Sequence, residues 1–233
     1  MSGIISRANK TVFIFAYVYL GIGAAAFVSY LLAGMSPLDA VCHAMSVCAT
    51  GGFSSRNLSI AAFDSTLIEG ITILFMYLSS IHFGVIFLCF VNRSFKPLNN
   101  PILKFYTLCL LVFALLTGFS LKISGVEPSL GRALWEGTFQ TVSIASTTGF
   151  AIADNASWPL CSNLLLMFMA VMCGCAGSTS GGVKADRVLV LLKSTARQIG
   201  RILHPSSINE VRLGNRVIRE DVVAPQVLPR IGR

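Results

Sequence analysis

The chain has 233 residues, of which 54% are hydrophobic and only 12% are charged. Because typical globular proteins are about 25% charged, this composition excludes an ordinary water-soluble domain. A net charge of +8 raises the question of nucleic-acid binding. However, most of the basic residues lie in three clusters beside apolar runs, at 7–10, 93–104 and 184–233. The positive-inside rule of membrane proteins explains these clusters without a nucleic-acid partner.

The first half of the chain predicts a spanning helix, a short re-entrant helix, a polar loop and a second spanning helix. The apolar run over 11–33 is long enough to cross a bilayer, which takes about 20 residues, and too long for a signal-peptide core. The run over 38–49 has only 12 residues, a length that suits a pore helix. The next spanning helix is expected over 66–91.

The second half predicts the same order of elements. A spanning helix is expected over 102–123 and a second pore helix over 133–145. A long apolar segment over 159–192 follows, and we expect it to be a broken helix because a glycine-rich stretch interrupts it.

The chain therefore divides into two pore repeats, 1–98 and 99–200, and a polar, basic connection over 201–233. This pattern predicts an all-α integral membrane protein built from repeated helix–re-entrant pore helix–loop–helix units. The two regions on the side of the polar loops, 34–69 and 122–158, hold six acidic and three basic residues. We expect these regions to face outward and both chain ends to be cytoplasmic.

Two short Thr/Gly stretches follow the expected pore helices. The first motif, 49–53, reads Ala-Thr-Gly-Gly-Phe, and the second motif, 146–150, reads Ser-Thr-Thr-Gly-Phe, with their Thr, Gly and Phe matches 97 positions apart. Irregular backbone at membrane depth is tolerated where it lines a water-filled cavity. Carbonyl oxygens in such loops replace the hydration shell of a cation. The candidate residues of an ion selectivity filter are Ala49, Thr50, Gly51, Gly52, Ser146, Thr147, Thr148 and Gly149.

A glycine loop, 174–182, carries four glycines in nine residues. A phosphate-binding loop is disfavoured because Val183 stands where that motif requires Lys. A second interpretation is a broken helix whose loop obstructs a pore and acts as a gate, with a simple packed kink as its alternative. The gate residues would be Gly174, Gly177, Ser178, Thr179, Ser180, Gly181 and Gly182.

An intramembrane serine protease is the competing function from the enzyme class. Ser178 or Ser180 would be the nucleophile, and His82 or His43 would be the base. No third residue stands out to orient the base, and this hypothesis leaves both Thr/Gly motifs unexplained. We expect the chain not to be an enzyme and to hold no cofactor.

Three stretches resemble the Trk/Ktr/HKT superfamily of potassium transporters, most closely its bacterial TrkH type: Ala-Thr-Gly-Gly-Phe-Ser at 49–54, the second motif, and Gly-Cys-Ala-Gly-Ser-Thr at 174–179. The resemblance covers essentially the whole chain. It implies four repeats around one pore, each a helix–re-entrant pore helix–filter loop–helix unit of the potassium-channel type, of which this chain matches the second and third. A fragment of a longer protein, a truncated gene, half of a split one and a non-conducting remnant are all open explanations.

The resemblance also implies roles for these segments. The filter carbonyls would bind K⁺, which is the transported ion, and Gly52 and Gly149 would favour K⁺ over Na⁺. The glycine loop would be the intramembrane gate. The implied partners are membrane lipid, a second copy or the missing repeats, and a cytoplasmic nucleotide-binding regulatory subunit, with no nucleic acid. The implied location is the cell inner membrane, as a multi-pass protein.

Overall fold

The computed structural model describes residues 2–203, 212–213 and 216–217. The described chain is mainly helical, and the apolar composition of its helices confirms the coarse fold prediction. The first half contains helices α1 (Ser2–Leu32), α2 (Pro37–Cys48), α3 (Thr66–Ser80) and α4 (Phe83–Asn92), with 3-10 turns η1 (Ser59–Phe63) and η2 (Lys96–Leu98). The second half contains α5 (Pro101–Ile123), α6 (Leu130–Ala145), η3 (Asn155–Ser157), α7 (Leu160–Val171), β1 (Met172–Cys173), β2 (Val183–Lys184) and α8 (Ala185–Leu203).

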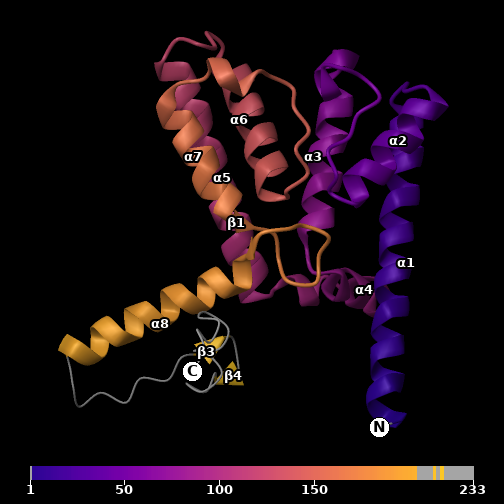
Figure 1. Cartoon of the computed structure of the whole chain (residues 1–233), viewed down its shortest axis with the longest axis vertical. Helices are drawn as coiled ribbons and strands as arrows, with labels where there is room; N and C mark the ends of the chain where they lie inside the picture. Colours follow the sequence, from indigo (N-terminus) through magenta and orange to yellow (C-terminus); the bar gives the residue numbers. More distant parts are fainter. Residues whose placement is uncertain (1, 204–211, 214–215, 218–233) are drawn as a thin grey trace, which may run out of the picture.

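Figure 1 shows the two halves side by side, with α1 along one edge and α5 to α7 on the opposite side. The short helices α2 and α6 each turn back into their own half after a longer helix, and the loop between β1 and β2 lies between the halves. Helix α2 packs mainly on α1, and α6 packs mainly on α5. This arrangement directs the C-terminal ends of α2 and α6 toward the same central region.

Both short helices begin at a serine cap. The Ser36 hydroxyl accepts a hydrogen bond from the N–H of Asp39 (3.1 Å), and Pro37, which has no N–H to satisfy, takes the first helical turn. Ser129 caps α6 in the same way, through the N–H of Arg132 (3.5 Å). The sequence predicted that the second short helix begins at residue 133. In the structure it begins three residues earlier, at Leu130.

Close backbone contact holds α5 against α6. A Cβ atom added at Gly137 of α6 would lie only 2.7 Å from the backbone nitrogen of Gly118 in α5. Small residues at such a crossing let two membrane helices approach closely. Between the halves, the buried Glu69 of α3 accepts hydrogen bonds from Trp135 (2.5 Å) and Arg132 (3.3 Å) of α6. The two halves are therefore tied together by a buried charged group.

The prediction of one continuous helix over 66–91 is wrong. The structure has two helices, α3 and α4, that meet at an angle of 99°. Ile81 is extended between them, and the His82 side chain caps α4 by accepting a hydrogen bond from the N–H of Gly84 (2.9 Å). Figure 1 shows α4 turning from the end of α3 toward α1.

The broken helix expected over 159–192 has different limits. Its first part, α7, ends at Val171, and its second part, α8, runs on to Leu203, past the expected repeat boundary at 200. Helix α8 carries cationic residues along its length and leaves the bundle in Figure 1. An amphipathic, cationic helix is typical of a membrane surface and not of a spanning segment.

Two helices are long and apolar enough to cross a membrane, namely residues 11–32 of α1 and all of α5. The bent pair of α3 and α4 would be a third span, whereas α7 is shorter than a bilayer requires. Among the described residues, the spans expected over 11–33 and 102–123 therefore contain helices of bilayer length, the one expected over 66–91 is bent, and the broken one expected over 159–192 contains no helix that passes by itself. In the connection expected over 201–233, α8 covers the first three residues and β3 (Arg212–Leu213) pairs antiparallel with β4 (Arg216–Val217). The rest of that connection lies outside the described residues.

Candidate functional site

The first motif leaves α2 through a defined C-terminal turn. The N–H of Gly51 donates to the carbonyl of Ser46 (2.8 Å), and the N–H of Thr50 donates to that of Val47 (3.3 Å). This pair of bonds is the Schellman motif, in which the residue after the helix cap takes the left-handed conformation. The carbonyl oxygens of 50–52 consequently lie outside the hydrogen-bond ladder of the helix.

The second motif repeats this turn, residue for residue, 97 positions later. The N–H of Thr148 donates to the carbonyl of Ser143 (3.0 Å), and the N–H of Thr147 donates to that of Ile144 (2.9 Å). The sequence repeat is therefore also a repeat of backbone geometry.

Left-handed threonines occupy the same place in both turns. Thr50 has a φ of 52° and Thr147 a φ of 58°. Glycine usually fills this position, and a β-branched residue with positive φ is uncommon because its side chain crowds the backbone. The cost is about 1–2 kcal/mol for each residue. Such strain persists only where surrounding contacts hold the residue in place.

The two motifs touch each other through their backbones. A Cβ atom added at Gly52 would lie 2.0 Å from the carbonyl oxygen of Thr148, and Gly52 also has a φ of 70°. By contrast, a Cβ added at Gly149 would meet nothing within 4 Å. Beyond the motifs, the N–H of Ala61 donates to the carbonyl of Ala151 (3.3 Å). The structure thus brings the two predicted filter segments together.

The glycine loop is closed at its base by β1 and β2. These strands are parallel, with Met172 opposite Val183 and Cys173 opposite Lys184. Gly182 must be glycine at this neck, since its φ is 63° and an added Cβ would lie 2.3 Å from the Cys173 sulfur. The seven predicted gate residues therefore belong to one closed loop.

The glycine loop fills the break between α3 and α4. The N–H of Cys175 donates to the carbonyl of Ser80 (2.9 Å), and the N–H of Thr179 donates to that of Ser79 (3.3 Å). In return, the N–H of Phe83 donates to the carbonyl of a loop residue, Gly177 (2.9 Å). In this way each irregular segment satisfies backbone groups that the other leaves unpaired, as the membrane interior demands.

The glycine loop also contacts both motifs through the strained threonines. The hydroxyl of Thr50 donates to the carbonyl of Thr179 (3.1 Å). The hydroxyl of Thr147 accepts a hydrogen bond from the N–H of Gly181 (2.7 Å). The same residue type at the same place in each motif therefore holds the loop directly beneath the two turns.

Charged residues hold the loop on the side of α8. The carboxylate of Asp186 accepts a hydrogen bond from the N–H of Ala176 (3.0 Å). The ammonium group of Lys184 donates to the carbonyl oxygen of Ser180, and the hydroxyls of Ser178 and Ser180 are paired at 2.8 Å. The glycine loop is therefore held by the break between α3 and α4, by the two motifs, and by Lys184 and Asp186.

The residues of the protease hypothesis are not assembled for catalysis. The Ser178 hydroxyl donates to the carbonyl of Cys175 (2.6 Å). His82 caps α4, and both ring nitrogens of His43 are engaged elsewhere, by Asp39 and Ser54. Among the described residues, neither histidine is hydrogen-bonded to Ser178 or Ser180.

Comparison with known proteins assigns the class. The family model for TrkH, described as a cation transport protein, matches residues 4–226. The match places the chain among the cation transport proteins. The chain belongs to the TrkH family, whose members are transporters and not enzymes, so the protease hypothesis is wrong.

Curated relatives of the same family cover nearly the whole chain. It is 35% identical over 210 residues to the Trk system potassium uptake protein TrkH of Vibrio parahaemolyticus, covering 89% of this chain and 43% of the relative. It is 32% identical over 220 residues to TrkH of Escherichia coli K12, covering 94% and 45%. The chain spans somewhat less than half the length of these relatives.

A solved structure has the same fold. The crystal structure of the potassium transporter TrkH from Vibrio parahaemolyticus matches with a TM-score of 0.88 and 33% identity. The match covers 97% of this chain and 48% of that chain. The fold described above is therefore that of about half of a potassium transporter of this family.

Sequence reasoning missed the residues that receive the loop. Ser79, Ser80 and His82 form a polar cluster within an apolar run, and that cluster was the available signal for a break. Apolar residues on both sides favoured an unbroken span. The reasoning also missed the contacts of Asp39 with Ser55 and Arg56, which join residues far apart along the chain.

The packing of the glycine loop against Ser80 predicts that Gly174 and Gly181 differ in how well they tolerate substitution by alanine. In Gly174→Ala, the new Cβ would lie 2.7 Å from the carbonyl oxygen of Ser80, so the loop should leave that site and its amides at 175–181 should exchange hydrogen faster, by about tenfold. Gly181→Ala is the matched control, because its nearest neighbour is an ordinary 3.7 Å contact with Thr147. Hydrogen-exchange mass spectrometry of the purified chain in nanodiscs measures both. Equal exchange in the two variants would contradict the packing described here.

Proposed function

We propose that this chain forms part of a K⁺-uptake pore, in which the two motifs supply filter carbonyls and the glycine loop is an intramembrane gate. The observation that carries the proposal is a pair of equivalent left-handed turns, at Thr50 and at Thr147. The two turns lie against each other, and both bind the glycine loop. Family membership and the names of the relatives support potassium as the ion.

The filter assignment rests on backbone placement. Each turn leads the chain out of a short helix, so that the carbonyls of 50–52 and 147–149 are available to a cation. Carbonyl rings of this kind bind K⁺ by replacing its hydration shell. Gly52 supports the assignment further, because only glycine permits its close approach to the Thr148 carbonyl.

The gate assignment rests on the position and the attachments of the loop. It is bonded to both motifs and to the break between α3 and α4, so it lies across the path that an ion would take from the filter. Single hydrogen bonds contribute only about 0.5–1.5 kcal/mol each. A few of them can therefore hold a closed state and be released when the loop moves aside.

The distribution of charged residues and the family membership support a location, an orientation and a set of partners for the pore. We propose a multi-pass protein of the cell inner membrane with the motifs facing outward and both ends of this chain cytoplasmic. The partners are lipid, a second copy or further pore repeats, and a cytoplasmic nucleotide-binding regulatory subunit. A non-conducting remnant is the alternative, and ion flux distinguishes the two.

The filter assignment predicts a loss of selectivity in Gly52→Ser and Gly149→Ser. Both residues have positive φ, so a side chain adds about 1–2 kcal/mol of strain and reorients the carbonyls, which should lower the K⁺/Na⁺ flux ratio by about tenfold. Gly52→Ser should also reduce total flux, because its side chain meets the Thr148 carbonyl. The measurement is radioactive rubidium and sodium uptake in cells that carry each variant at the native locus.

Gly125→Ser is the matched control for the filter variants. Gly125 has a similar φ of 75° and open space around it, but it lies in the turn after α5. Its flux ratio should equal that of the unmodified chain. Unchanged ratios in both filter variants would refute the assignment.

The gate assignment predicts higher flux when the loop is weakened. Deletion of 177–181 removes the hydrogen bonds to both motifs, so rubidium uptake into K⁺-starved cells should rise several-fold while the K⁺/Na⁺ ratio is kept. Lys184→Gln, which loosens Ser180 without shortening the loop, should cause a smaller rise. Lys96→Gln makes the same charge change outside the loop and serves as the control. If the deleted protein folds and reaches the membrane but carries no flux, the loop is structural and not a gate.

A further inference from the structure

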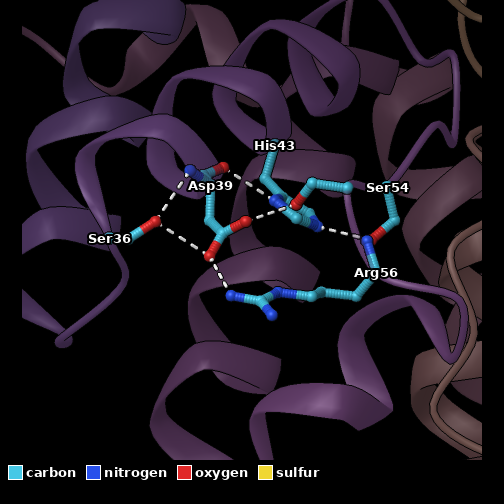
Figure 2. Close-up of polar contacts among 6 residues, drawn as sticks. Ser36, Asp39, His43, Ser54 and Arg56 are labelled. Atoms are coloured by element: carbon cyan, nitrogen blue, oxygen red, sulfur yellow. Dashed lines mark hydrogen bonds and ion pairs between the residues drawn. The ribbon is translucent and has the colours of Figure 1, made fainter.

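A network of side chains ties the segment after the first motif to α2. Figure 2 shows His43 and Asp39 of α2 facing Ser54 and Arg56 of that segment. The Nδ1 atom of His43 lies 2.7 Å from the carbonyl oxygen of Asp39, and its Nε2 atom lies 2.8 Å from the Ser54 hydroxyl. The His43 side chain is fully buried, so both ring nitrogens are satisfied inside the protein.

The direction of these hydrogen bonds follows from their partners. A backbone carbonyl can only accept, so Nδ1 of His43 carries the hydrogen and donates it to Asp39. In the neutral ring, Nε2 then accepts from the Ser54 hydroxyl, whose oxygen in turn accepts from the N–H of Arg56 (3.0 Å). A continuous chain of bonds thus runs from α2 to the segment that leaves the first motif.

The ring of His43 faces the other motif. It stacks on Phe150, the last residue of the second motif, with ring centroids 5.6 Å apart and an interplanar angle of 27°. Phe63 packs edge-on against the same ring at 5.3 Å. His43 therefore contacts Ser54, the residue directly after the first motif, through a hydrogen bond, and Phe150 of the second motif through its ring face.

The second pore helix has a partial counterpart of His43. Gln140 stands 97 positions later, and its side-chain amide donates to the carbonyl of Ala153 (3.0 Å), a residue 97 positions after Arg56. Both short helices thus use the same position to hold the segment leaving their own motif. Glutamine has no aromatic ring, so only His43 also supports the opposite motif.

A carboxylate adds a second attachment in the first half. Asp39 accepts from Arg56 (2.7 Å), Ser55 (2.5 Å) and Ser36 (2.9 Å). Arg56, with the Ser55 and Ser36 hydroxyls, holds the pKa of Asp39 well below its usual value, so the carboxylate is ionised at neutral pH. Because the Arg56 side chain is 53% exposed, the ion pair adds little stability and serves mainly to orient the segment.

We infer that His43 is a positioning residue that sets the spacing between the two motifs, by a hydrogen bond to Ser54, which directly follows the first motif, and by ring stacking on Phe150 of the second motif. This inference rests on the proposed filter, since the spacing of the motifs fixes the distance between their carbonyls. His43 itself does not touch the ion path; it acts through Ser54 and Phe150.

Two variants separate the two contacts. His43→Gln keeps a group that can bond Ser54, as Gln140 shows for its own segment, but it removes the ring. His43→Phe keeps the ring and removes both hydrogen bonds. Hydrogen-exchange mass spectrometry of the whole purified chain in lipid nanodiscs reports on each motif through peptides that cover 51–57 and 148–153.

Opposite effects on the two peptides are the expected result. His43→Gln should speed exchange at 148–153 by about tenfold and leave 51–57 nearly unchanged, whereas His43→Phe should do the reverse. Equal changes in both peptides, or none in either, would overturn the inference. If either variant fails to fold, Phe150→Leu and Ser54→Ala remove the same two contacts from the opposite side and must give the same split.

Ion flux distinguishes this inference from the filter proposal. If the exchange pattern is as expected and the K⁺/Na⁺ ratio falls several-fold in both variants, positioning and filter are both supported. If the exchange pattern is as expected but the flux ratio is unchanged, His43 positions the motifs while the filter assignment fails.

Discussion

The structure depends on backbone groups that must find partners in a medium without water. The break between α3 and α4 frees the carbonyls of Ser79 and Ser80 and the N–H of Phe83, and the glycine loop binds all three. An unpaired group in the hydrocarbon region costs several kcal/mol, so each irregular segment stabilises the other in this arrangement. These contacts hold the loop at the centre of the chain, where it meets both motifs.

Strain at the two threonines is offset by the same contacts. Each left-handed threonine costs about 1–2 kcal/mol. In return, each turn gains two helix-terminal hydrogen bonds, one of them from the threonine N–H, and each threonine hydroxyl makes one contact with the loop. Glycine would relieve the strain but would lose the hydroxyl that reaches the loop. The choice of threonine in both motifs therefore links the geometry of the turns to the position of the loop beneath them.

The sequence was sufficient for features that arise from local pattern. Composition and the length of the apolar runs indicated the helical membrane class, and the offset of 97 between Thr50 and Thr147 indicated equivalent turns. It was insufficient where distant segments decide the structure. The residues around Ile81 are apolar enough for a helix, and the break is favourable there because the loop binds the freed backbone groups and His82 caps α4. The stacking of His43 on Phe150 likewise joins residues about a hundred positions apart.

The central claim is that both motifs present their carbonyls to one ion directly above the glycine loop. Anomalous diffraction from rubidium-soaked crystals of the native assembly that contains this chain tests it most directly. We predict rubidium peaks against the carbonyl oxygens of 50–52 and 147–149, on the side of the motifs away from the loop, and their loss when sodium replaces rubidium. Ordered motifs without rubidium, with the ion bound elsewhere in the protein, would contradict the account.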